Sequence, residues 1–381
     1  MEAMLPASDY VSLIQLRRLF SDTTTSYKYL FFLALLDEIA EHDAPSPTAI
    51  ATRDVIVGAL ALAWYPTKYF RISLGTQDQL VQTLEAVCSR GPDGIDRLRP
   101  HHLAAVRMFV DQRLEKREAA QLSRWVPYRL ISPWFQEELR GKRDHLKNGL
   151  IAKLADDTFH RRRPLYRLVG KADALEVHPD WWVYVKANHT TLREWVLWHW
   201  LTYLQPRNPT VPSLSAKLVP VVERASLTRQ RSYWRQYVER QPMSCIYTGE
   251  RLEGVESLDH VLPWSFVAHD RWWNLVPVSS RTNSSKGDAI PPVASIAPDL
   301  AELHAKALVE SRSYLSAKAW RDVVAEYAED LRADANALGG NVETTRIELA
   351  GCYRKSLPPL AEMALLQGFP SWSGSNALAA T

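Results

Sequence analysis

Apolar positions in the first 240 residues recur mainly with helical spacing. Thr25 or Ser26 is a candidate cap of a helix whose apolar face extends to Leu36. The apolar run Leu60–Trp64 predicts another buried helix, which ends before Pro66. Thr191 and Glu194 have the spacing of a capping box ahead of an aromatic-rich helix that Pro206 stops. Residues 1–240 are therefore predicted to be a helical N-terminal region, with a sub-boundary in the proline-interrupted stretch 206–220.

The pattern changes over residues 241–292. Two short runs of β-type residues, Val255–Leu258 and Leu275–Val278, are separated by a long loop and followed by the polar helix candidate Ser280–Lys286. Helical spacing returns afterwards, and we expect residues 293–381 to form a helical C-terminal region with a frayed tail from 373. The helices predicted there are Ala305–Leu315, Ala317–Leu338 and Leu357–Leu366. The predicted fold is mainly α with one embedded β-loop-β-α module, and α+β overall.

Composition limits the classes of protein that the chain can be. Of its 381 residues 46% are hydrophobic and 23% charged, which excludes a largely disordered chain. The net charge is only +3, so nucleic-acid binding requires local basic patches. Three scattered cysteines, no signal-like N-terminus and no apolar run of the ~20 residues that span a bilayer predict a cytoplasmic protein without a membrane partner.

The most specific pattern lies between Cys245 and Gly287. An Asp259–His260 pair closes the first predicted strand, Asn274 opens the second, and Asn283 and Lys286 share one face of the helix that follows. This segment resembles the HNH, or ββα-metal, nucleases, and its spacing is most similar to that of the HNH domain of RNA-guided CRISPR effectors. The resemblance covers this module alone and leaves the rest of the chain unassigned.

The chemistry of phosphodiester hydrolysis explains these residue types. The reaction needs an activated water and neutralisation of the charge on the leaving oxygen. A histidine can accept a proton near neutral pH, which makes His260 the candidate general base. Mg²⁺, or Mn²⁺ in its place, favours oxygen ligands such as those of Asp259 and Asn283, and the resemblance implies that these two hold it. The resemblance also implies that Asn274 orients the base, and Lys286 can face the phosphate as a point charge.

A structural zinc, present in many HNH proteins, is not expected here. It would need two Cys-x-x-Cys knuckles, but Cys245 is the sole thiol at the four positions, because the other three hold Thr248, Ser279 and Thr282. We therefore expect the module to be braced by packing against the flanking helices, through Trp264, Phe266, Trp272 and Trp273.

Basic side chains next to the module are candidates for nucleic-acid binding. On a helix over 224–240, Arg224, Arg231 and Arg235 lie on one face beside an apolar stripe. We predict that these three arginines contact nucleic acid together with Arg281 and Lys286 of the module. A second basic stretch, 160–171, could equally be a solvated face. The acidic helix that includes Asp322–Asp334 is expected to face away from DNA or toward a protein partner.

These observations predict a metal-dependent HNH endonuclease that acts on DNA, with RNA still open. HNH modules fused to unfamiliar helical regions resemble restriction or anti-phage defence effectors, in which the helical regions bind a protein partner or a second copy. One alternative is a non-catalytic nucleic-acid-binding or scaffold subunit of a larger assembly. Another is a nuclease of homing type. Because one module supplies one active site, a monomer is expected to nick one strand.

Overall fold

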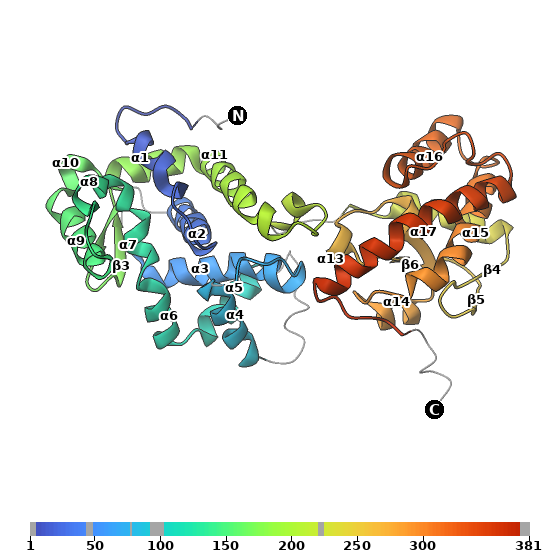
Figure 1. Cartoon of the computed structure of the whole chain (residues 1–381), viewed down its shortest axis with the longest axis horizontal. Helices are drawn as coiled ribbons and strands as arrows, with labels where there is room; N and C mark the ends of the chain where they lie inside the picture. The colour runs from blue at the N-terminus through green and yellow to red at the C-terminus, as the bar shows by residue number, and fades with distance from the viewer. Residues whose placement is uncertain (1–4, 43–48, 77, 92–102, 220–224, 374–381) are drawn as a thin grey trace. The chain divides into compact units, whose positions relative to one another are not determined.

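The chain folds into two compact units. The computed structural model describes residues 5–42, 49–76, 78–91, 103–219 and 225–373. The first unit is Met1–Pro209 with Leu214–Val222, and the second is Thr210–Ser213 with Glu223–Thr381 (Figure 1). Both are mainly helical and carry small antiparallel sheets, in agreement with the predicted fold class. The finer division at residues 241 and 293 stays a prediction, and the tail beyond 373 lies outside the described residues.

Two apolar helices form the core of the first unit. α2 (Tyr27–Glu41) and α3 (Thr52–Trp64) are buried on nearly all sides, and α2 packs against both α3 and α11 (Pro179–Leu204) (Figure 1). The described part of this unit contains further helices. They are α1 (Leu13–Arg17), α4 (Gln79–Ser89), α5 (Leu103–Arg113), α6 (Lys116–Ser123), α7 (Val126–Leu130), α8 (Gln136–Leu139), α9 (Asp144–Asp157) and α10 (Phe159–Arg162).

Helix α11 begins earlier than predicted. It starts at Pro179, where the His178 side chain accepts a hydrogen bond from the Asp180 N–H, and it kinks at Asn188, three residues before Thr191. The only departure from helical geometry inside it is at Asn188. The predicted start at Thr191 is therefore wrong: the interruption lies at Asn188, and Thr191 is inside the helix. The helix ends at Leu204, ahead of Pro206, as predicted.

The first unit also contains a sheet that the sequence pattern did not predict. Strands β1 (Ala49–Ala51), β2 (Tyr166–Val169) and β3 (Ala174–Val177) pair in the order β1-β3-β2, all antiparallel. The basic stretch 160–171 is largely neutralised around it, because Arg162, Arg163 and Arg167 make ion pairs with acidic side chains of the same unit.

The second unit contains the predicted β-loop-β-α order. It comprises α12 (Thr228–Arg240), β4 (Met243–Ser244), β5 (Arg251–Leu252), β6 (Ser257–His260), α13 (Trp264–Val267), β7 (Leu275–Val278), α14 (Ser280–Lys286), α15 (Val293–Ser311), α16 (Ala317–Leu331) and α17 (Val342–Leu366). β7 and α14 have the predicted limits, whereas α15 and α17 begin well before the predicted Ala305 and Leu357. Both helices continue through prolines, and their mutual packing supports them there (Figure 1).

Aromatic side chains join the β6–β7 pair to the surrounding helices. Phe266, Trp272 and Trp273 belong to one buried apolar cluster with residues of α12, α15, α16 and α17, and Trp264 is also buried. The expected bracing of the module by packing is confirmed. No helix within the described part of the chain is long and apolar enough to cross a membrane.

Candidate active site

The strand pair β6–β7 is the base of the site. In its antiparallel register Asp259 pairs with Val276 and His260 with Leu275. All four residues of β7 are buried, which fixes this register because a one-residue shift would expose them. Helix α14 follows directly, and the side chain of its N-cap residue Ser279 accepts a hydrogen bond from the Thr282 N–H at 3.2 Å.

Helix α14 brings two of the predicted site residues onto one face of β6. Asn283 Nδ2 donates to Ser257 Oγ at 2.7 Å, and Lys286 Nζ lies 3.0 Å from Asp259 Oδ2. Ser257 and Asp259 are two residues apart on a strand, so they share a face. Asn283 and Lys286 are three apart on a helix and share one too. The structure therefore places Asp259, Asn283 and Lys286 together.

The Asp259 carboxylate is buried and already has partners. Its residue is 3% exposed. Besides the lysine, it accepts a 2.7 Å hydrogen bond from the Tyr247 hydroxyl. Burial, and next the negative charge of Asp259, hold the pKa of Tyr247 well above its usual range, so the phenol remains a donor. Tyr247 was not among the predicted site residues. Its only sequence signal is its place in the Cys-Ile-Tyr-Thr-Gly run that opens the module.

Lys286 points inward rather than toward the surface. Its side chain is 1% exposed, and Nζ also donates to the His260 carbonyl at 2.7 Å. Burying an ammonium group carries a large desolvation cost, which an opposite charge and further hydrogen bonds offset. In this structure Lys286 thus neutralises Asp259, which differs from the expected orientation toward a phosphate.

The His260 imidazole faces an acid that sequence reasoning missed. His260 Nε2 lies 2.7 Å from Asp270 Oδ1, and both side chains are largely buried. Asp270 belongs to the loop after α13, which turns at Ala268 with a φ of +57°. In the sequence, the only signal for this contact is that an aspartate follows the Asp259–His260 pair in the same loop, ten residues after His260. Among the described residues, nothing forms a hydrogen bond with Nδ1 of His260, and this nitrogen is available as a proton acceptor when Nε2 carries the proton.

Asn274 ties the loop after β6 to the start of β7. It is fully buried; its Nδ2 donates to the Leu262 carbonyl at 2.9 Å, and its Oδ1 accepts from the Leu262 N–H at 2.8 Å. Its own carbonyl accepts from the Val261 N–H. These three bonds hold the backbone that immediately follows His260.

Carboxylates of α16 contact the same loop from its other end. Glu326 accepts a hydrogen bond from the Trp272 N–H at 2.9 Å, and Asp330 accepts one from Trp273 Nε1 at 2.8 Å. Arg271 forms ion pairs with both acids. Burial, the main cause, raises the pKa of Glu326. These two acids of the helix support the segment that leads into Asn274, and the expectation that the helix faces away from DNA or toward a protein partner stays a prediction.

Two of the predicted basic contacts, Arg231 and Arg235, lie on α12, and two, Arg281 and the buried Lys286, lie on α14. Arg231 Nη1 donates to the Glu256 carbonyl, and Glu256 Oε2 accepts from the Ser280 N–H at the start of α14. This chain of contacts places the exposed face of α12 next to α14. Arg235 and Arg281 are exposed, whereas Arg224 lies outside the described residues.

The oxygen donors suit a hard divalent cation. Asp259 offers a carboxylate, and Asn283 Oδ1 makes no hydrogen bond with the described residues, since only its Nδ2 is engaged. One carboxylate and one amide, completed by water and substrate oxygens, are typical ligands of Mg²⁺. The described residues contain no group of three or more His, Cys, Asp or Glu side chains that could hold a metal.

The donors at the four positions of a zinc knuckle do not suit zinc. Cys245 is buried in the apolar cluster. The other three positions carry hydroxyl groups, and these form local hydrogen bonds: Thr248 to Glu250, and Ser279 to Thr282. One thiol and three hydroxyls are not a tetrahedral zinc ligand set.

Comparison with known proteins assigns the segment that carries this site. Neither the curated proteins nor the solved structures gave a match to the chain. Residues 245–292 match the model of the HNH endonuclease family. The matched segment contains Asp259, His260, Asn274, Asn283 and Lys286, and the parts of the chain on either side of it are unassigned. This segment is therefore similar to the HNH endonucleases, and the similarity indicates a nuclease domain.

Proposed function

We propose that this protein is a metal-dependent endonuclease that hydrolyses phosphodiester bonds in DNA. One observation carries the proposal: within the segment that matches the HNH family, α14 holds Asn283 and Lys286 over β6 at Ser257 and Asp259, and the next residue of that strand, His260, pairs with Asp270. We interpret the Asp259 and Asn283 oxygens as donors for a cation and His260, at the end of the same strand, as the base. Such a combination suits hydrolysis of a phosphate ester.

His260 is the general base in this proposal. Its Nδ1 takes a proton from the attacking water, while Asp270 accepts the hydrogen bond from Nε2–H at 2.7 Å. Asp270 is thus a positioning residue, because it selects the tautomer that leaves Nδ1 unprotonated. Asn274 keeps the backbone after His260 in place, which holds the imidazole in a constant orientation.

Asp259 and Asn283 would hold the cation. A bound Mg²⁺ or Mn²⁺ supplies positive charge that stabilises the leaving 3′ oxygen. Lys286 neutralises the Asp259 carboxylate in this structure, and with a cation held there its ammonium group would be available to the substrate phosphate. By the family resemblance, the products carry 5′-phosphate and 3′-hydroxyl ends.

Substrate binding is assigned to exposed arginines beside the site. Arg231 and Arg235 on α12 and Arg281 on α14 provide positive charge for phosphate contacts. One active site in each chain predicts nicking of a single strand in each event. The biological role that we propose is restriction or anti-phage defence in the cytoplasm, with the helical regions binding a partner protein or a second copy.

The test is conversion of supercoiled plasmid by the full chain. We expect the wild-type protein to produce nicked circles with Mg²⁺ or Mn²⁺ and none with EDTA. His260→Ala should abolish nicking, whereas His145→Ala, which removes an exposed histidine of the first unit, should leave it unchanged. Nicking by His260→Ala at the wild-type rate would refute the assignment of the base.

The non-catalytic alternative is favoured by a different observation, namely that Asp259 is already neutralised by Lys286 and accepts a hydrogen bond from Tyr247. A binding or scaffold subunit would bind DNA equally well with Mg²⁺ and with EDTA and would leave the plasmid intact. In that case His260→Ala would change neither DNA binding nor plasmid integrity. The plasmid reactions with Mg²⁺ and with EDTA therefore distinguish the endonuclease from the non-catalytic subunit.

A further inference from the structure

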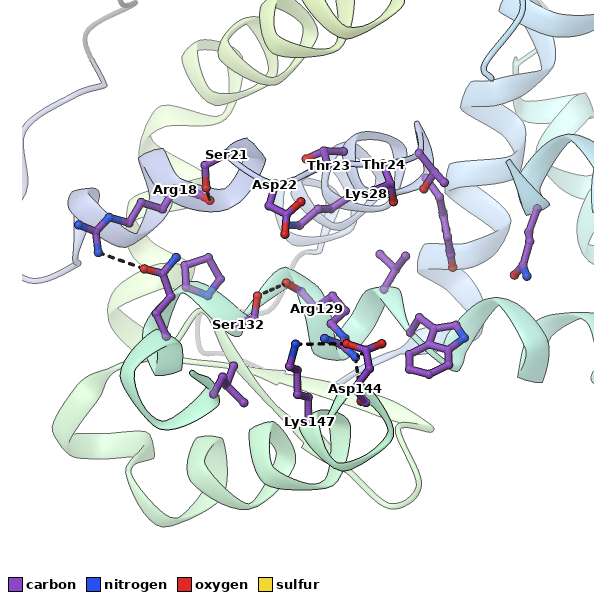
Figure 2. A pocket seen from close by; sticks show the side chains of 18 of the residues that line it. Arg18, Ser21, Asp22, Thr23, Thr24, Lys28, Arg129, Ser132, Asp144 and Lys147 are labelled. Atoms are coloured by element: carbon purple, nitrogen blue, oxygen red, sulfur yellow. Dashed lines mark hydrogen bonds and ion pairs between the residues drawn. The ribbon is translucent and has the colours of Figure 1, made fainter. Parts of the chain in front are cut away.

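The first unit contains a cavity that has no part in the proposed nuclease site. Its volume is about 760 Å³. Arg18, the segment from Ser21 to Thr25, and Lys28 line one wall, and Arg129, Ser132, Asp144 and Lys147 line the facing wall (Figure 2). Cavities of roughly 300–1,000 Å³ are typical of small-molecule sites.

Positive charge predominates around the cavity. Five cationic side chains line it against two carboxylates. Arg129 and Lys147 both pair with Asp144, at 3.1 and 3.2 Å, which leaves Asp22 as the only acid facing the remaining cations. The unbalanced cations are Arg18, Lys28 and Arg140. A ligand that carries several negative charges would balance this excess.

Lys28 is a half-buried cation of the cavity wall. Burial lowers its pKa to about 8, against a smaller opposite effect of Asp22. Within the described parts of the chain, no side chain or carbonyl forms a hydrogen bond or ion pair with its ammonium group. A charged group held away from water without a partner is destabilised, and an anion bound beside it would remove that cost.

The walls also offer uncharged groups that suit an aromatic, hydroxyl-bearing ligand. The Tyr27 hydroxyl is buried without a hydrogen-bond partner in the described residues, and its side chain lines the cavity. Trp125 lines it as well, with the Arg129 guanidinium 5.5 Å from its ring centroid. Buried polar atoms of this kind normally have a partner, which a ligand can supply.

We propose that this cavity binds a nucleotide, with its phosphates at Lys28, Arg18 and Arg140 and its base against Trp125. The cations account for the phosphates, and the indole ring provides a surface on which a planar base can stack. The hydroxyls of the Ser21–Thr25 segment and of Ser132 are available to the sugar and phosphate oxygens. The site is independent of the nuclease proposal, because all of these residues belong to the first unit.

The experiment is calorimetric titration of the full chain with ATP, GTP, CTP, UTP and pyrophosphate. We expect at least one nucleotide to bind, and Lys28→Met to weaken that binding by about tenfold or more. Lys153→Met removes an exposed lysine of α9 outside the cavity and should bind like wild type. Trp125→Leu should weaken nucleotide binding but not pyrophosphate binding.

Other outcomes would overturn the proposal. They are no binding of any of the four nucleotides, equal binding by wild type and Lys28→Met, and pyrophosphate binding as tight as that of the nucleotides. Displacement of the nucleotide by a 5′-phosphorylated oligonucleotide of higher affinity would identify the cavity as a nucleic-acid site instead. Two controls distinguish loss of the site from misfolding. Lys28→Arg keeps the positive charge and should retain nucleotide binding. Lys28→Met should unfold at the same thermal midpoint as the wild-type protein.

Discussion

Replacement of Asp270 by asparagine tests the most specific part of the proposed mechanism. The substitution keeps the shape of the side chain but removes the charge that faces His260 Nε2 at 2.7 Å. An asparagine can also donate from its amide to Nε2, which would leave the proton on Nδ1, the nitrogen that must accept one. Asp270→Asn should therefore lower the rate of cleavage and leave DNA binding unchanged.

The size of this effect follows from the geometry of the pair. The two side chains are only 11% and 16% exposed, so solvent screens their interaction weakly. A hydrogen bond to a charged group contributes about 1.5–3 kcal/mol. At about 1.4 kcal/mol for each factor of ten, cleavage should slow by roughly 10- to 150-fold.

The assay is single-turnover nicking of supercoiled plasmid with saturating protein and Mg²⁺. Asp288→Asn removes an exposed acid just after α14 and serves as the matched control. Imidazole in solution should restore part of the activity of His260→Gly, which lacks the base, but not that of Asp270→Asn. A rate within threefold of wild type for Asp270→Asn would show that the pair has no part in orienting the base.

Three further predictions concern stability, measured as unfolding of the second unit in the full chain. Lys286→Met and Asp259→Asn should each cost about 3–5 kcal/mol by leaving a buried partner unpaired, whereas the double variant should cost far less than their sum; additive losses in urea titrations would contradict this. His304 is buried and its pKa is lowered to about 3 by burial, so the unfolded chain takes up the proton first. The free energy of unfolding should fall by up to about 1.4 kcal/mol for each pH unit from pH 6.5 toward 3, and His304→Gln should lack that part of the slope. Gly339→Ala should lower the thermal midpoint by several degrees, because φ is +74° and a Cβ would lie 2.2 Å from Trp320; an unchanged midpoint would mean that the indole moves freely.

Elements governed by local chemistry could be predicted from the sequence. β7 and α14 have the predicted limits because a short run of β-type residues and an N-cap serine act over a few neighbouring positions. The early starts of α15 and α17 were missed because prolines normally end a helix. The β1-β3-β2 sheet was missed because its strands are short and Ala49–Ala51 pairs with a strand far away in the chain.

The candidate site divides in the same way. The sequence alone placed Asp259, His260, Asn274, Asn283 and Lys286 in one module, because helix and strand periodicity determines which side chains share a face. Only the tertiary structure turned Lys286 inward against Asp259 and brought Asp270 to the His260 imidazole. These contacts depend on how completely each group is removed from water and on the path of the loop after α13. Both are properties of the packed second unit as a whole, since desolvation is set by every neighbour of a charge rather than by the residues next to it in the chain.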